Sequence, residues 1–262
     1  MTIHEVHGIQ VEFERYGRPE GHPVVVHHGL VGAAALPAEW QQLAIAAGID
    51  LISIARPGYG QSDPVVLESI VDWSPLLAGL LDGLGVGEFS VLGISAGAPY
   101  SYATAATLSA RVRRVAILSG LGLVNEPQTR TLYTPTSQEA FASFADGTEE
   151  QTRAFWQTQL RDALTQLPED HPWQHAVTAS LAHDAAGPAR EAILQQRPWG
   201  FDLAAITAPV TLWHSRQDED VPFPTAEIIA ERIPTATLNI QPEAGHTPST
   251  ASARAAIEFL AG

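Results

Sequence analysis

The chain has 262 residues, no cysteine and a formal net charge of −15 at pH 7. All 14 of its basic residues are arginine, because the sequence contains no lysine. These counts exclude disulfides, thiolate metal sites, cysteine nucleophiles and lysine-based catalysis. Walker-type phosphate binding also needs a lysine and is excluded as well. The acidic balance disfavours nucleic acid and anionic membranes as partners.

The N-terminal residues show no basic segment followed by an apolar one, so the sequence predicts no signal peptide. The longest apolar runs are broken by Gly, Asp or Pro before they reach the length of a membrane span. We therefore expect a cytoplasmic protein whose partner is a small-molecule substrate, with no membrane and no nucleic acid involved. The absence of cysteine fits a reducing compartment.

Strand-like and helix-like segments alternate along most of the chain. In chain order the expected elements are strand 9–16, strand 23–28, helix 37–47, strand 49–55, helix 66–84, strand 88–94, helix 96–110, strand 112–119, strand 210–214, helix 224–233, strand 236–240 and helix 250–260. Pro75 should bend or divide the helix in which it lies. Strands that alternate with helices indicate a mainly parallel sheet covered on both faces, the α/β class.

The middle of the chain follows a different pattern. Residues 123–200 show helical spacing and no convincing strand, and the segment is rich in phenylalanine and tryptophan. A structureless loop of that length is implausible in a compact domain. We therefore expect a helical insertion over residues 123–200, carried by a core made of residues 1–122 and 201–262.

The sharpest motif is Gly93-Ile-Ser95-Ala-Gly97, which matches the pattern G-x-S-x-G. A predicted strand leads into it and a helix of small residues follows it, which is the context that the motif requires. A tight strand-to-helix turn of this kind forces the serine into a strained backbone, and the flanking glycines avoid a clash with it. The motif predicts that Ser95 is a nucleophile.

A serine hydroxyl needs a base with a pKa near neutrality, which points to histidine. His246 lies in a loop between the last predicted strand and the last helix, at the carboxyl edge of the sheet where Ser95 should also emerge. A carboxylate is then needed to orient the imidazole. Asp218 is the preferred candidate, and Asp220 is the alternative, although Asp220 is also placed to cap the next helix.

These landmarks together resemble the α/β-hydrolase fold family, in its esterase-type branch with a helical cap. They are His27-His-Gly-Leu30 after an early strand, the turn Arg56-Pro-Gly-Tyr-Gly-Gln-Ser62, the elbow at Ser95, and the two loops that carry Asp218 and His246. The order Ser, Asp, His along the chain is that of α/β-hydrolases. The match covers nearly the whole chain outside the insertion.

The resemblance implies further assignments. Backbone N–H groups of Leu30 and Ala96 would form the oxyanion hole, the insertion would be a cap over the pocket, and neither a metal nor an organic cofactor would be needed. His28 would be structural. The family's aspartate-nucleophile branches, which include dehalogenases and epoxide hydrolases, do not fit, because this chain has Ser95 at the elbow.

Three functions remain open on the sequence. The first is hydrolysis of a small to medium apolar carboxylic ester through an acyl-enzyme on Ser95. The second keeps the same triad but acts on another bond, as a carbon–carbon bond hydrolase, a lactonase or an acyltransferase. The third is a ligand-binding, receptor-like protein with weak turnover, since one fold hosts many functions.

Overall fold

A single eight-stranded sheet runs through the computed structural model, which describes residues 1–262, in the order β1-β2-β4-β3-β5-β6-β7-β8. The strands are β1 Thr2–Val6, β2 Ile9–Gly17, β3 His22–His27, β4 Ile49–Ile54, β5 Phe89–Ile94, β6 Val112–Leu118, β7 Val210–Ser215 and β8 Ala236–Gln241. Only β1 and β2 run antiparallel to their neighbours, and β3 to β8 are parallel to one another. The mainly parallel sheet that the sequence predicts is confirmed.

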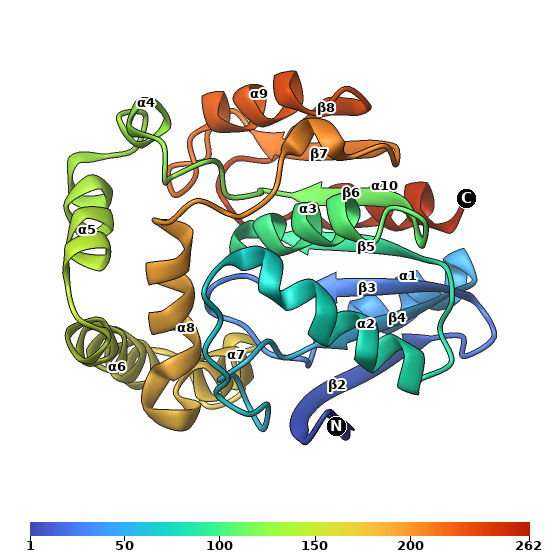
Figure 1. The fold of residues 1–262 in the computed structure, drawn as a ribbon, viewed down its shortest axis with the longest axis horizontal. Helices are drawn as coiled ribbons and strands as arrows, with labels where there is room; N and C mark the ends of the chain where they lie inside the picture. The colour runs from blue at the N-terminus through green and yellow to red at the C-terminus, as the bar shows by residue number, and fades with distance from the viewer.

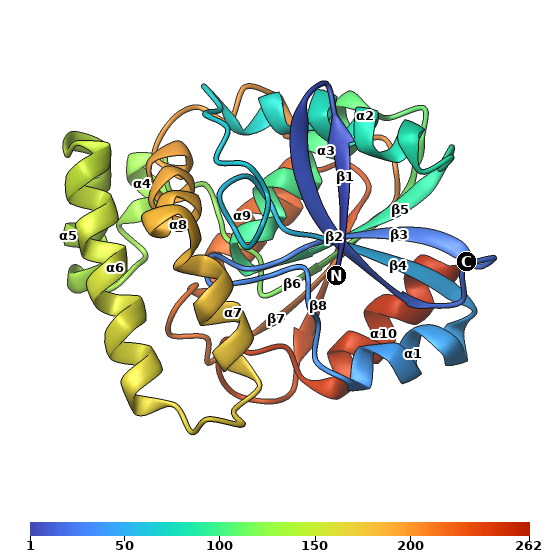
Figure 2. The same cartoon turned by 90° about the horizontal axis from the view of Figure 1, so that it is seen from below.

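Helices cover both faces of the sheet, as Figures 1 and 2 show. The helices of the core are α1 Glu39–Ala47, α2 Trp73–Gly83, α3 Ala98–Thr107, α9 Phe223–Arg232 and α10 Thr250–Ala261. Helices α1 and α10 lie on one face, whereas α2 and α3 lie on the other. Both faces are therefore shielded from water, which explains why the parallel strands read as continuous apolar runs.

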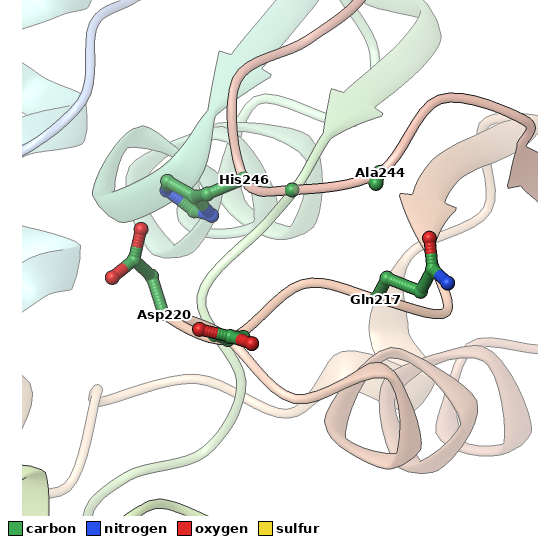
Figure 3. A pocket seen from close by; sticks show the side chains of 6 residues that line it. Gln217, Asp220, Ala244 and His246 are labelled. Atoms are coloured by element: carbon green, nitrogen blue, oxygen red, sulfur yellow. The ribbon is translucent and has the colours of Figure 1, made fainter.

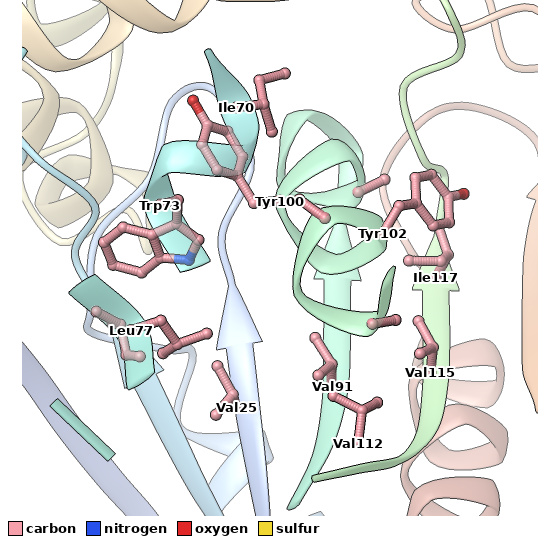
Figure 4. Close-up of a cluster of buried hydrophobic side chains, with 14 of the residues drawn as sticks. Val25, Ile70, Trp73, Leu77, Val91, Tyr100, Tyr102, Val112, Val115 and Ile117 are labelled. Atoms are coloured by element: carbon pink, nitrogen blue, oxygen red, sulfur yellow. The ribbon is translucent and has the colours of Figure 1, made fainter. Parts of the chain in front are cut away.

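Alternate residues of each strand enter two separate apolar cores. Val25 of β3 and Ile52 of β4 belong to a large cluster with α2 and α3, and Trp73, Tyr100 and their neighbours fill it (Figure 4). The strand residues between them, such as Val24, belong to a second cluster with α1 and α10. Each fully buried apolar side chain contributes about 1.5–3 kcal/mol relative to exposure.

Three elements differ from the sequence-based expectation. Strand β1 was not predicted, and it pairs with β2 at the edge of the sheet. The helix predicted over 66–84 begins only at Trp73, after a short 3₁₀ turn at Ile70–Asp72. Pro75 therefore lies in the first turn, where its missing N–H would have no intrahelical partner and costs little. The kink predicted at Pro75 was wrong for this reason. Helix α3 ends at Thr107 rather than Ala110.

The residues between β6 and β7 form helices and no strand. These helices are α4 Pro127–Arg130, α5 Pro135–Asp146, α6 Glu149–Gln166, α7 Trp173–Ser180 and α8 Ala182–Gln195. They lie beside the edge of the sheet at which the parallel strands end (Figure 1). The division into a core and a cap at residues 123–200 stays a prediction. None of the helices in the structure combines the length and the apolar character needed to cross a membrane.

Candidate active site

Ser95 sits in a strained turn between β5 and α3. Its φ is 51°, in the left-handed region that side-chain-bearing residues rarely adopt. The two motif glycines allow the chain to pack tightly there. A Cβ atom at Gly97 would lie 2.1 Å from the His27 carbonyl oxygen, and one at Gly93 would lie 2.5 Å from Ser101 Oγ. The glycine spacing is thus explained by close approach to strand β3 and to helix α3.

The structure brings Ser95, His246 and Asp218 together. Nε2 of His246 lies 2.8 Å from Ser95 Oγ, and its Nδ1 lies 2.9 Å from Asp218 Oδ2. An ionised carboxylate can only accept a hydrogen bond, so Nδ1–H donates to Asp218 and Nε2 is free to accept the serine proton. Asp218 follows β7, and His246 lies in the loop between β8 and α10.

The Asp218 carboxylate is buried and surrounded by donors. Its Oδ1 accepts hydrogen bonds from the backbone N–H groups of Asp220 at 3.1 Å and Val221 at 2.8 Å. Its Oδ2 lies 3.1 Å from Nε2 of the buried His214. Burial alone would raise the pKa of Asp218, but the contacts with His214 and His246 outweigh burial and hold that pKa well below its ordinary value. The carboxylate is therefore ionised when it orients His246.

Asp220, the alternative acid, has a different place. It contributes its backbone N–H to Asp218. It does not cap the following helix, because α9 begins after Pro222 with no side-chain cap. Its side chain lines a depression in the surface. The other lining residues are Gln217, Glu219, Ala244, Gly245 and His246 (Figure 3). Ser95 does not line this depression, so the depression is not the pocket above the nucleophile.

One group of possible metal ligands overlaps with these residues. Ligand atoms of Asp218, Asp220 and His246 lie within 4.8 Å of one another. Both ring nitrogens of His246 are already engaged, one with Asp218 and the other with Ser95. A cation bound through His246 would therefore have to break the contact with one of them.

The two predicted oxyanion donors flank Ser95. A Cβ atom at Gly29 would lie 3.5 Å from Ser95 Cβ, so the chain that leads into Leu30 passes beside the nucleophile. The Leu30 N–H donates to no acceptor within the protein. Ala96 is the second residue of the helical segment that begins at Ser95, where N–H groups lack an intrahelical partner. The role of these two N–H groups as oxyanion donors stays a prediction.

Sequence reasoning missed two groups of side chains near this site. His214, at the end of β7, contacts Asp218, and Arg56 forms a fully buried ion pair with Glu191 of α8. From the sequence, Arg56 was recognised only as part of a turn. Glu191 was one of many acidic residues in predicted helical segments. No local signal could connect them, because 135 residues separate the two in the chain.

Comparison with known proteins agrees with the fold. Residues 22–249 match the family model described as the alpha/beta hydrolase fold. The chain belongs to the alpha/beta hydrolase fold family, and it is a hydrolytic enzyme.

Two curated relatives illustrate the range of the family. One is a 2-hydroxy-6-oxononadienedioate/2-hydroxy-6-oxononatrienedioate hydrolase of Pseudomonas putida, 27% identical over 224 residues, which are 77% of this chain and 72% of the relative. The other is a pimeloyl-[acyl-carrier protein] methyl ester esterase of Nitrosomonas europaea, 26% identical over 216 residues, covering 76% of this chain and 78% of the relative. One cleaves a dioate and the other a methyl ester.

Solved structures show the same fold. An esterase from Exiguobacterium antarcticum superposes with a TM-score of 0.75 at 18% identity, covering 99% of this chain and 97% of that one. The enol-lactonase from Burkholderia xenovorans superposes with a TM-score of 0.71 at 16% identity, covering 98% of this chain and 97% of that one. At such low identity the similarity shows the fold alone. The substrate has to be inferred from the site itself.

Proposed function

We propose that this enzyme is a serine esterase that hydrolyses small to medium apolar carboxylic esters through an acyl-enzyme. The observation that carries the proposal is the continuous chain from Ser95 Oγ to His246 and on to Asp218, with contacts of 2.8 and 2.9 Å. This arrangement activates a hydroxyl for attack on a carbonyl carbon.

The reaction takes place in two halves. Ser95 Oγ attacks the ester carbonyl while its proton moves to His246 Nε2, and the resulting oxyanion accepts hydrogen bonds from the N–H groups of Leu30 and Ala96. The tetrahedral intermediate collapses, and the alcohol leaves with the proton from His246. Water then gives a proton to His246 and attacks the acyl-enzyme. The second tetrahedral intermediate collapses and releases the carboxylic acid, and the proton passes from His246 back to Ser95 Oγ. Asp218 holds the imidazole and stabilises its charged form.

The surroundings of the oxyanion donors favour an apolar substrate. Val31, which follows Leu30, packs against a cluster of Leu160, Val177 and Ala185 from the inserted helices, and Trp156 packs against the same cluster. An acyl or alcohol chain that reaches this cluster would exchange water for apolar contacts. The insertion, in this proposal, acts as the cap that selects such chains.

Cleavage of a carbon–carbon bond in a dioate is the second candidate, and the Pseudomonas putida relative favours it. Carboxylate groups of a substrate are normally bound by free cations. The chain has no lysine, and the partly buried arginines of the insertion are engaged: Arg153 and Arg190 with Glu149, and Arg130 with the Val124 carbonyl. These pairings support a neutral ester over a dianionic substrate.

The decisive experiment is a substrate panel on the purified protein, run beside Ser95→Ala. The panel holds p-nitrophenyl esters of two to eight carbons, an uncharged lactone, and a vinylogous diketone with a terminal carboxylate. We expect turnover of the esters, and labelling by a fluorophosphonate that Ser95→Ala abolishes. Preferential turnover of the diketone would replace the ester proposal by carbon–carbon bond hydrolysis. Labelling without turnover of any panel member would indicate a binding protein.

A further inference from the structure

Arg56 and Glu191 form a buried ion pair between the sheet and the insertion. Arg56 follows β4, and its side chain is fully buried, while the Glu191 side chain of α8 is 5% exposed. The pair is bidentate: Arg56 Nε donates to Glu191 Oε1, and Nη2 donates to Oε2 at 2.8 Å. Burial alone would lower the pKa of Arg56, but the charge of Glu191 more than offsets this and raises it. The guanidinium is therefore permanently charged.

The other side of the same guanidinium holds the backbone before Leu30. Nη1 of Arg56 donates to the His28 carbonyl oxygen at 2.6 Å, and Nη2 donates to the Gly29 carbonyl oxygen at 3.1 Å. The backbone N–H of Arg56 donates to Nε2 of His28 at 3.3 Å, so the ring hydrogen lies on Nδ1. That Nδ1 is 2.7 Å from the Gly29 oxygen. The Gly29 carbonyl thus receives two hydrogen bonds.

The Gly29 carbonyl and the Leu30 N–H belong to one planar trans peptide, in which the C=O and N–H bonds point in opposite directions. A carbonyl fixed on Arg56 and His28 therefore fixes the direction of the Leu30 N–H. Donors on the oxygen also polarise the peptide and strengthen its N–H as a donor. The next carbonyl, that of Leu30, accepts a hydrogen bond from Tyr59 Oη at 2.8 Å. Both peptide groups around Leu30 are held.

Helix α8 reaches this point through close backbone contact. A Cβ atom at Gly58 would lie 2.7 Å from the Gly187 nitrogen, and one at Gly187 would lie 2.6 Å from the Tyr59 ring. Glu191 is four residues, about one helical turn, further along α8. The contact of the glycines therefore determines how far the Glu191 carboxylate reaches toward Arg56.

We propose that Arg56, held by Glu191, is a positioning residue that orients the Leu30 N–H toward the oxyanion, so that the seating of α8 controls the rate of the chemical step. The inference rests on the proposed esterase function. Stability alone does not explain the pair, because replacing a buried ion pair by uncharged residues of similar size is often neutral or stabilising. Misdirection of one oxyanion donor, in contrast, weakens only the transition state.

The test is the double variant Arg56→Met/Glu191→Gln, which removes both buried charges and leaves neither unpaired. We expect a midpoint of thermal unfolding near that of the wild type, and kcat for p-nitrophenyl butyrate lowered about 10- to 100-fold, below the effect of losing a donor altogether. KM should change little. Binding of a trifluoromethyl ketone, which forms a tetrahedral oxyanion on Ser95, should weaken by the same factor as kcat/KM, whereas binding of the product butyrate should not change.

The matched control is Arg15→Met/Asp50→Asn. That ion pair joins β2 to the first residues of β4, far from the strand ends that carry Ser95, and it should leave kcat unchanged. A folded Arg56→Met/Glu191→Gln protein with wild-type kcat and wild-type inhibitor affinity overturns the inference.

If that double variant does not fold, the single variant Arg56→Lys tests the inference instead. A lysine keeps the charge, but its three donors cannot replace the four hydrogen bonds that the planar guanidinium of Arg56 makes. Lowered kcat with unchanged KM supports the inference, and wild-type kcat overturns it. A wild-type protein that neither hydrolyses esters nor is labelled at Ser95 overturns the esterase proposal as well, which separates the two failures.

Discussion

Nε2 of His246 lies 2.8 Å from Ser95 Oγ although the two residues are 151 positions apart in the chain. The sheet order explains this proximity. Strands β5, β7 and β8 run parallel, so the turn after β5 and the loops after β7 and β8 all emerge at one edge of the sheet. Strand β6 alone separates β5 from β7. The contact is thus a property of topology, and each residue is carried there by its own strand.

The strain at Ser95 leads to the first prediction. A φ of 51° disfavours any residue with a Cβ, by about 1–2 kcal/mol. Ser95→Gly should therefore unfold in urea with a free energy about 1 kcal/mol higher than Ser95→Ala. Both variants should lose esterase activity and fluorophosphonate labelling. Equal free energies of unfolding for the two variants would show that the turn is relaxed in solution.

The choice between the two acids gives the second prediction. Asp218→Asn should lower kcat by several orders of magnitude, because an amide at this position can bind the wrong tautomer of His246. Asp220→Asn should stay within about threefold of the wild type, because its side chain makes no hydrogen bond to His246. Steady-state rates on one p-nitrophenyl ester compare the two directly. A larger loss in Asp220→Asn would reverse the assignment of the acid.

Ser95 and His246 could be predicted from the sequence because each lies in a recognisable local sequence pattern. Ser95 lies between glycines after an apolar strand, and His246 lies between the last strand and the last helix. The contacts that support these two residues have no such local sequence pattern. Arg56 meets Glu191 only because α8 packs onto the turn after β4, and that packing depends on the shape of the whole insertion. Apolar spacing along one helix does not encode it.

The fold shows the same limit at a smaller scale. Buried parallel strands such as β4 have an unmistakable β-branched pattern, and their bounds were predicted to within a residue or two. Strand β1 is mostly exposed and spans only five residues, with polar and apolar residues in no regular alternation. Its stability comes from pairing with β2, which is a tertiary contact. The sequence-based helix began too early, at residue 66, and placed Pro75 in a helix interior. Proline is unfavourable there but is well tolerated in a first turn, which is where Pro75 lies.

Close packing at Gly97 makes the third prediction. A Cβ there would lie 2.1 Å from one backbone oxygen and 2.6 Å from the next, so Gly97→Ala must displace the end of β3 from α3. We expect a loss of about 2–3 kcal/mol in the free energy of unfolding. Gly87→Ala is the matched control, since a Cβ at Gly87 would meet no atom within 4 Å. Similar stability of the two variants in urea titrations would contradict the packing at the elbow.

Two buried histidines give the last prediction, which concerns stability and pH. His27 accepts a hydrogen bond from Trp73 Nε1 at 3.0 Å and contacts Ser101 Oγ at 2.9 Å. Burial, with the nearby charge of Arg56, lowers the pKa of His27 and of His28 well below the ordinary value of 6.5. Below that value the unfolded chain binds protons that the folded chain does not. The free energy of unfolding should therefore fall as the pH falls below about 6.5, with a limiting slope of about 1.4 kcal/mol per pH unit for each histidine.

The variant that isolates this effect is His27→Gln, which keeps a polar side chain but removes one titrating group. All other groups are shared with the wild type, so the difference between the two stability curves reports His27 alone. The curve of the variant should be shallower below about pH 6.5, by up to about 1.4 kcal/mol per pH unit. Urea titrations at each pH measure it. Parallel curves would mean that His27 takes up its proton in the folded protein as readily as in the unfolded chain, and that its neutral, buried state is not maintained by the surrounding core.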